Sequence, residues 1–229
     1  MRAGRPKQKA RDSLWGAFHL TNGGKPKQQL DNFLGMEDGS DPTILLAVDW
    51  ERSKDGTILD IDGIREFVQL FHDALGRYPV LYGGWTLRDT PEIVMGDELL
   101  GKCPLWYQRY SWEPKALPVK TWPTYTLWQF ADEHRGFGAP PIKVLPGADF
   151  NRFQGSAAEL AAAWPFSAPG PIKPGPSCPV IIKSSRAASM FAKARASTKM
   201  CLAHLSSTTW YPGMTSRPTR VGCMSRKAR

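Results

Sequence analysis

Cysteine and histidine are scarce in this chain, with four residues of each among 229. The cysteines, at positions 103, 178, 201 and 223, form no Cys-x-x-Cys pair and no Cys/His ligand spacing. Structural zinc sites and disulfide frameworks depend on such spacings. The sequence therefore predicts neither a metal site nor a disulfide-stapled fold, and we expect no cofactor.

Long apolar runs are also missing. No run approaches the roughly 20 residues that a membrane-spanning helix needs. The basic N-terminus lacks the apolar segment of a secretory signal. We therefore expect no membrane partner, and the sequence leaves the localisation and the route of any export open. It is equally silent on the oligomeric state.

Acidic residues are absent from both ends of the chain. Residues 1–11 hold five basic residues, and residues 167–229 hold eleven, with no aspartate or glutamate in either segment. Residues 12–166 therefore hold the other 14 basic residues and all 21 acidic ones, a net charge of −7. A basic protein often binds nucleic acid, but here only the ends are basic. We expect no nucleic-acid binding by the body, and the basic tail alone is a weak basis for it.

The most informative stretch that is present runs from Thr43 to Arg52. Five apolar residues, 44–48, lead into Asp49 and Glu51, a pattern typical of a strand buried on both faces. Side chains alternate along a strand, so these two carboxylates point the same way. Paired acids at the carboxyl end of a buried strand are typical of an α/β active site. The alternative is a strand that runs out into a solvated acidic turn.

Strand-like and helix-like segments alternate through the body of the chain, which predicts parallel βαβ units in an α/β layer or barrel. The domain boundaries follow from composition: a disordered basic N-terminus at 1–13, a folded domain at 14–166, and a disordered Pro/Ser/Lys/Arg-rich tail at 167–229. The expected strands span 14–20, 43–49, 79–84, 104–110, 125–130 and 147–151, and the expected helices span 25–36, 60–76, a short segment from 90, and 156–164.

The tail admits more than one interpretation. It follows a Pro/Gly linker at 169–176, and a short helix around 187–199 is possible from its residues. It could tether the protein to an anionic polymer such as a cell wall or nucleic acid. The alternatives are an unstructured appendage or translation in a wrong reading frame.

Seven motifs in order give the chain its resemblance to a known family. They include the strand with Phe18-His19, the Asp49-Trp50-Glu51 strand, a Pro-x-x-Tyr strand ending at Tyr82, and a closing Trp-Gln-Phe and Pro-Gly-x-Asp-x-Asn-x-Phe signature. The other two motifs are Gln28–Leu34 and Pro104–Trp106. All seven follow one another in the family's order, from about Trp15 to Gly155. Together they resemble the glycoside hydrolase family 25 lysozymes, the N-acetylmuramidases of the Chalaropsis type.

That resemblance implies a (β/α) TIM-like barrel that cleaves the β-1,4 bond between N-acetylmuramic acid and N-acetylglucosamine in peptidoglycan. It implies Glu51 as the general acid, with Asp49 and Asp149 stabilising developing positive charge and orienting the acetamido group or water. The protein would act on the cell wall after release or export. The implied substrate-binding residues are Tyr82, Trp106, Trp128, Gln129 and Asn151. For the three aromatic residues among them, core packing is the alternative.

Two departures from the family pattern lead to further expectations. Only about fourteen residues precede the strand at Trp15, so the first family strands, with another active-site aspartate, would be missing and the barrel incomplete. Phe18 stands where the family has tyrosine. The alternative function is therefore a catalytically dead remnant that at most binds cell-wall glycan.

Overall fold

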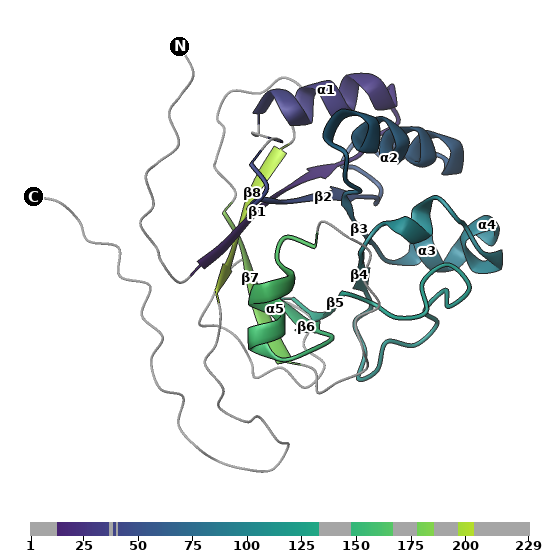
Figure 1. The fold of residues 1–229 in the computed structure, drawn as a ribbon. Coiled ribbons are helices and arrows are strands. Elements are labelled where there is room, and N and C mark those ends of the chain that lie inside the picture. Colours follow the sequence, from purple (N-terminus) through teal and green to yellow (C-terminus); the bar gives the residue numbers. More distant parts are fainter. Residues whose placement is uncertain are drawn as a thin grey trace, which may run out of the picture.

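The computed structural model describes residues 13–36, 39, 41–132, 148–166, 178–185 and 197–203. Eight strands form a closed barrel in which each strand lies beside its neighbour in sequence (Figure 1). Strands β1 to β5 are parallel, whereas β6, β7 and β8 pair in antiparallel fashion and β8 returns to β1. The strands are β1 (Ser13–Leu20), β2 (Leu45–Asp49), β3 (Val80–Gly83), β4 (Leu105–Gln108), β5 (Leu127–Ala131), β6 (Ala148–Phe153), β7 (Cys178–Ser185) and β8 (Ser197–Ala203).

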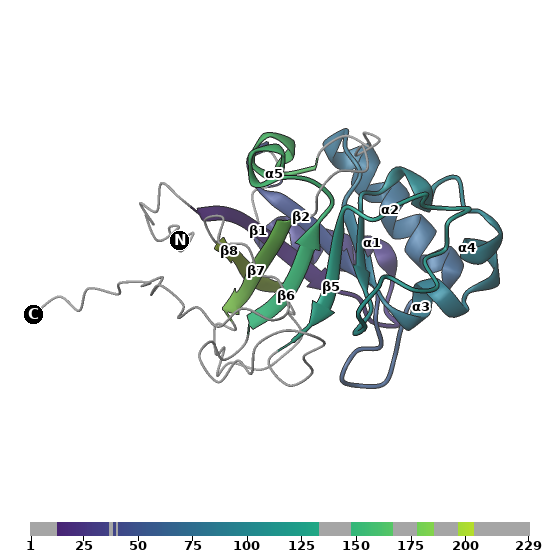
Figure 2. The same ribbon diagram turned by 90° about the horizontal axis from the view of Figure 1, so that it is seen from below.

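Helices join β1 to β2, β2 to β3 and β3 to β4, as crossovers between parallel strands require, whereas a segment without a helix joins β4 to β5. They are α1 (Pro26–Met36), α2 (Ile61–Leu75), α3 (Trp85–Asp89) and α4 (Pro91–Met95), followed by a short 3-10 turn at Leu100–Lys102. These four helices gather on one side of the barrel, and α5 (Ala157–Ala163) lies apart from them (Figure 2). The predicted alternation of strands and helices is confirmed from β1 to β4.

Helix α2 shows why the sequence folds this way. Its buried residues recur at helical spacing, and Asp60 caps its first turn by accepting from the Gly63 N–H at 2.7 Å. Gly76 ends it in the left-handed conformation (φ 67°) and donates its N–H to the His72 carbonyl. The predicted helix from Asp60 to Gly76 is confirmed. Its buried face consists of Ile64, Phe67, Val68 and Phe71.

Alternation along β2 separates two cores. Leu46 and Val48 pack with residues of α1 and α2, outside the barrel. Leu45 and Ala47 pack with a second cluster drawn from the other strands, inside the barrel. The interior cluster comprises Leu45, Ala47, Val80, Trp106, Leu127, Phe153, Leu160, Phe166, Val180 and Ile182. Residues 44–48 are therefore buried on both faces, as predicted.

Helix α5 covers the end of the barrel at which β2 begins. Leu160 of α5 and Phe166, just beyond it, belong to the interior cluster, and the Trp164 indole N–H donates to the Thr43 carbonyl at 3.2 Å. Ser156 and Glu159 form a capping box that starts the helix, at the first residue of the predicted helix 156–164. The opposite end, where β1 to β5 finish, carries the polar residues of the candidate site.

The segment after residue 166 is where the structure differs most from the sequence-based expectation. An α/β barrel of the expected kind is present in β1–β6, but its open edges are closed by β7 and β8, from the tail that was expected to be disordered. Val180 and Ile182 alternate into the interior, and this local pattern outweighs the lack of acidic residues in the tail. Residues 197–199, the end of the helix considered around 187–199, belong to β8, and the rest of that segment lies outside the described residues.

Strand β6 also differs, since it runs antiparallel to β5 where parallel units were expected. The sequence between the two strands is rich in glycine and proline and has no apolar helical periodicity that would suit a crossover helix. The expected disordered N-terminus lies outside the described residues except for Ser13, which begins β1. Within the described part of the chain, no helix has the length and apolar character to cross a membrane.

Because β7 and β8 close the barrel, we expect residues 167–203 to stabilise the folded domain at 14–166. A chain ending at residue 167 leaves β1 and β6 as unpaired edges and should lose the single cooperative unfolding transition of the full chain. A chain ending at residue 203 keeps β8 and should unfold as the full chain does. Thermal unfolding followed by circular dichroism measures this, and equal midpoints for all three chains would contradict it.

Candidate active site

Asp49 is the last residue of β2 and lies on the interior face of the barrel. It follows Leu45 and Ala47 in the alternation and pairs in register with Tyr82 of β3. Its carbonyl accepts from the Thr21 N–H at 3.0 Å and the Thr21 hydroxyl at 3.1 Å, and the next residue, Trp50, donates its N–H to the Tyr82 carbonyl at 2.9 Å. The carboxyl end of β2 is thus fixed from both neighbouring strands.

Asp149 reaches the same end of the barrel because β6 is antiparallel. The start of β6 lies beside the end of β5, with Asn151 in register with Gln129. Asp149, Asn151 and Phe153 alternate on one face of β6, and Phe153 belongs to the interior cluster. The structure therefore brings Asp49, Glu51 and Asp149 to one end of the barrel, as the resemblance implied.

Hydrogen-bonded side chains lie beneath these carboxylates. The Tyr82 hydroxyl donates to Gln129 Oε1 at 2.6 Å, and the Trp106 indole N–H donates to Asn151 Oδ1 at 2.7 Å. Asn151 Nδ2 in turn donates to the Asp149 carbonyl at 3.3 Å, and the Tyr82 and Trp106 rings meet edge to face at 5.1 Å. Four of the five predicted substrate-binding residues thus form a buried polar layer of the barrel interior.

The electrostatics of Asp49 are dominated by burial. Its Oδ1 is buried and has no hydrogen-bond partner within the described residues. Desolvation, followed by the charges of Glu51 and Asp149, raises the pKa of Asp49 well above its usual value. Burial also raises the pKa of Glu51, and the positive charge of Arg88 partly opposes that rise.

These pKa directions define what the cluster can do chemically. Three carboxyl groups within electrostatic range, two of them with raised pKa, retain a proton at a pH where isolated acids have lost theirs. A protonated carboxyl beside an ionised one is the pairing that glycosidic bond cleavage requires.

Trp128 is not brought to the site. It lies on the opposite face of β5 from Gln129, is 2% exposed, and packs its ring against Tyr125 and Phe130 in the outer core. Its indole N–H donates to the Arg109 carbonyl at 2.8 Å. Core packing, the alternative considered from the sequence, accounts for this residue in the structure.

Sequence reasoning missed residues on the loops at the carboxyl ends of the strands. Trp85 follows β3 and is 40% exposed, and Trp112 follows β4 and is 66% exposed. Burial raises the pKa of the Tyr110 hydroxyl, and the charges of Asp132 and Asp149 raise it further, which places a fourth carboxylate, Asp132, near this end. The signal that could have found them is position, since Tyr110 ends a predicted strand and the other three lie within two residues after one.

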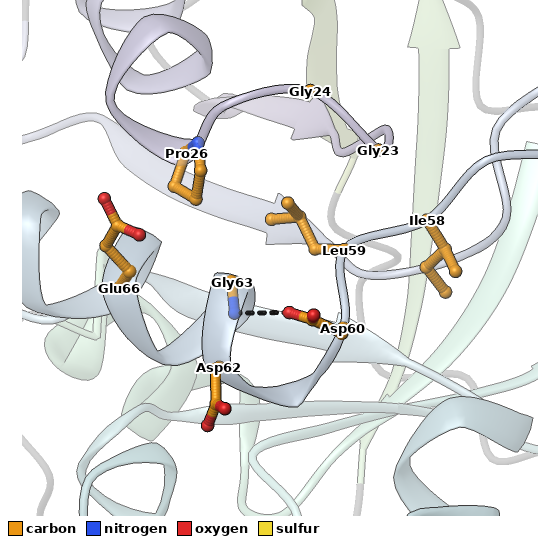
Figure 3. A pocket seen from close by; sticks show the side chains of 9 residues that line it. All are labelled: Gly23, Gly24, Pro26, Ile58, Leu59, Asp60, Asp62, Gly63 and Glu66. Atoms are coloured by element: carbon orange, nitrogen blue, oxygen red, sulfur yellow. Dashed lines mark hydrogen bonds between the residues drawn. The ribbon is translucent and has the colours of Figure 1, made fainter.

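A cavity of about 380 Å³ lies between the loops that follow β1 and β2, apart from the three carboxylates. Its acidic residues are Asp60, Asp62 and Glu66, and Asp60 is already engaged as the cap of α2 (Figure 3). Its other lining residues are Gly23, Gly24, Pro26, Ile58, Leu59 and Gly63. The raised pKa values of Asp49 and Glu51 and the hydrogen-bonded polar layer are instead found together at the end of the barrel that carries the three carboxylates.

The raised pKa of Asp49 makes a prediction about stability. Because the folded state binds a proton more tightly than the unfolded chain, the stability cost of Asp49 is absent below pH about 4 and grows as the pH rises through its folded pKa. Asp49→Asn should therefore raise the free energy of unfolding at pH 7, by about 1.4 kcal/mol for each unit of pKa shift, and not at pH 4.

Urea unfolding at both pH values measures this difference. Asp89→Asn, at an exposed aspartate, serves as the control and should change the free energy of unfolding little at either pH. An Asp49→Asn protein that matches Asp89→Asn at pH 7 would contradict the desolvated state of Asp49.

Comparisons with known proteins show which family the chain belongs to. The family model described as "Glycosyl hydrolases family 25" matches residues 3–138. No curated protein matches the chain. Solved structures that are similar include a muramidase from Acremonium alcalophilum, 28% identical with a TM-score of 0.49, and a family GH25 lysozyme from Aspergillus fumigatus, 25% identical with a TM-score of 0.48. Each alignment covers 63% of this chain and 70% of the other. Because the family match extends over more than half of the chain and includes Asp49 and Glu51, this chain belongs to the glycosyl hydrolases of family 25 and is a glycoside hydrolase.

Proposed function

We propose that this protein hydrolyses the β-1,4 bond between N-acetylmuramic acid and N-acetylglucosamine in peptidoglycan. Membership of family 25 supports glycoside hydrolysis, and the resemblance to its muramidases supports this substrate. The observation that carries the proposal is the cluster of Asp49, Glu51 and Asp149 at one end of the barrel, with the pKa of Asp49 and Glu51 raised.

Glu51 is the general acid in this proposal. It stands two residues beyond Asp49, past the end of β2, and is half-buried, so a bound sugar can reach it. Its raised pKa favours the protonated form that donates to the leaving-group oxygen. Burial raises the pKa of Asp49 as well, so Asp49 also retains a proton at a pH where an exposed aspartate has lost it. A substrate that covers Glu51 removes its remaining water and raises its pKa further.

Asp49 and Asp149 act as electrostatic and orienting groups. Positive charge that develops at the anomeric carbon favours the ionised form of Asp49, so its carboxylate stabilises the transition state more than the ground state. Asp149 orients the substrate acetamido group or the water. Tyr82 contacts the substrate, while Gln129, Asn151 and Trp106 hold Tyr82 and the start of β6 in place.

Cleavage of purified peptidoglycan tests the proposal. Wild-type protein should clear the suspension and release new reducing ends on N-acetylmuramic acid, identified by borohydride reduction and sugar analysis. Glu51→Gln should lower the rate by at least about 100-fold, because proton donation to the leaving oxygen is lost. Glu92→Gln, at an exposed glutamate of α4, is the matched control and should leave the rate unchanged.

Two results would overturn this reading. Equal clearing by wild type and Glu51→Gln would remove Glu51 from the acid role. No clearing by folded wild-type protein would favour the alternative, a catalytically inactive protein that at most binds cell-wall glycan.

The charge of Arg88 predicts a shift in the pH profile. Activity that depends on protonated Glu51 falls as the pH rises through the pKa of that group, and Arg88 lowers this pKa. Arg88→Gln should therefore move the descending limb of kcat/KM to higher pH, whereas Arg88→Lys keeps the charge and should move it little. A limb that stays in place in Arg88→Gln would contradict the coupling between the two side chains.

A further inference from the structure

An arginine and a tryptophan meet at the rim of the site, next to Glu51. Arg52 is the next residue after Glu51, and Trp85 begins α3 directly after β3. The Arg52 guanidinium carbon lies 5.8 Å from the centre of the Trp85 ring. Trp85 is 40% exposed and Arg52 is also exposed, so a tryptophan face and a positive charge are presented together.

The backbone brings this pair to the substrate side of the barrel. The register of Asp49 with Tyr82, and the bond from the Trp50 N–H to the Tyr82 carbonyl, keep the two chains side by side as they leave β2 and β3. A side chain at Gly84 would displace the end of the Gln108 side chain of β4 and lie tight against the Gln108 carbonyl, where the chain turns towards Trp85. Arg52 and Trp85 therefore follow the carboxyl ends of β2 and β3, and Glu51, the proposed acid, also follows the carboxyl end of β2.

The loop after Arg52 holds the guanidinium in position. Arg52 Nη1 donates to the Gly56 carbonyl at 2.6 Å. That turn is tied by Asp55 Oδ1, which accepts from the Thr57 N–H at 2.9 Å and from the Thr57 hydroxyl at 2.7 Å. An exposed arginine normally retains much side-chain entropy, so fixing it in advance lowers the entropic cost of binding a ligand.

The charge of the site explains why a cation at this rim would matter. The ionised members of the cluster of Asp49, Glu51 and Asp149 repel an anionic substrate, and Arg88 is half-buried with its Nη1 donating to the Gln108 carbonyl. Arg52 uses one of its five N–H donors in a hydrogen bond to the described residues. The rest of the planar fork matches the geometry of a carboxylate.

The two sugars of the proposed substrate differ in such a group. N-acetylmuramic acid carries a lactyl ether that ends in a carboxylate, or in a peptide with carboxylates of its own, and N-acetylglucosamine carries neither. We propose that Arg52 and Trp85 form a subsite that binds the acidic lactyl or peptide group of the muramic acid residue, with the sugar beside the indole face. The inference rests on the proposed function, and it makes this pair the determinant that separates acidic peptidoglycan strands from neutral N-acetylglucosamine polymers.

Equilibrium binding separates this inference from the chemistry. Two alternating oligosaccharides are compared, one with free lactyl carboxylates and one with the same groups converted to neutral methylamides. Isothermal titration calorimetry is done on protein that carries Glu51→Gln, so that the oligosaccharides are bound but not cleaved. It gives the ratio of their two Kd values. The acidic oligosaccharide should bind more tightly, and Arg52→Gln should reduce that preference by about five- to tenfold, the size of one charge-assisted contact.

Matched variants show whether the preference for the acidic oligosaccharide comes from Arg52 or from any positive charge on this loop. Lys54→Gln removes one positive charge from the same exposed loop and should leave the ratio unchanged. Trp85→Leu should weaken binding of both oligosaccharides alike. An unchanged ratio in Arg52→Gln, or an equal change in Lys54→Gln, would overturn the subsite.

Cleavage assays on protein that retains Glu51 distinguish a failure of the subsite from a failure of the proposed hydrolysis. If neither oligosaccharide is cleaved but the Kd ratio depends on Arg52, the subsite stands and the proposed reaction fails. If both are cleaved equally and the ratio does not depend on Arg52, the reaction stands and the subsite fails.

Discussion

The desolvation of the Asp49 carboxyl group is the interaction on which the rest of the site depends. A carboxyl at the end of a strand buried on both faces loses water, and one of its oxygens is offered no hydrogen bond by the described residues. A lone buried charge is costly, so the group holds its proton unless another charge compensates for the lost water. Glu51 and Asp149 are negative and make that cost larger.

The packing around β2 makes this arrangement possible. The outer core with α1 and α2 fixes one face of the strand, the barrel interior fixes the other, and α5 covers the end where it begins. The polar layer of Tyr82 and Gln129 then separates the carboxylates from the apolar interior. Stability is concentrated at one end of the barrel, and the group that costs stability stands at the other, a division typical of barrel enzymes.

Much of this could be predicted from local sequence, because local pattern determines these parts of the fold. The apolar run 44–48 predicted β2, and the apolar stripe within 60–76 predicted α2. Asp49, Glu51 and Asp149 were predicted from motif order and lie at one end of the barrel. Phe18, noted from the sequence in place of tyrosine, packs against the interior cluster.

What could not be predicted depends on non-local pairing. Trp128 and Gln129 are neighbours in sequence, and only the register of β5 decides which of them faces the interior. Strands β7 and β8 were missed because the composition of the whole tail outweighed the short apolar alternation at Val180 and Ile182. The Arg52–Trp85 contact joins loops that follow different strands, so no single motif contains it.

The most direct test of the central claim is a carboxyl titration by NMR on protein with 13C-labelled aspartate and glutamate side chains. The account predicts that one resonance, lost in Asp49→Asn, titrates well above the usual range of aspartate and shifts to lower pH when Glu51 is replaced by Gln. If every aspartate and glutamate titrates in the ordinary range, the carboxylates are neither desolvated nor coupled, and the account of this site is wrong.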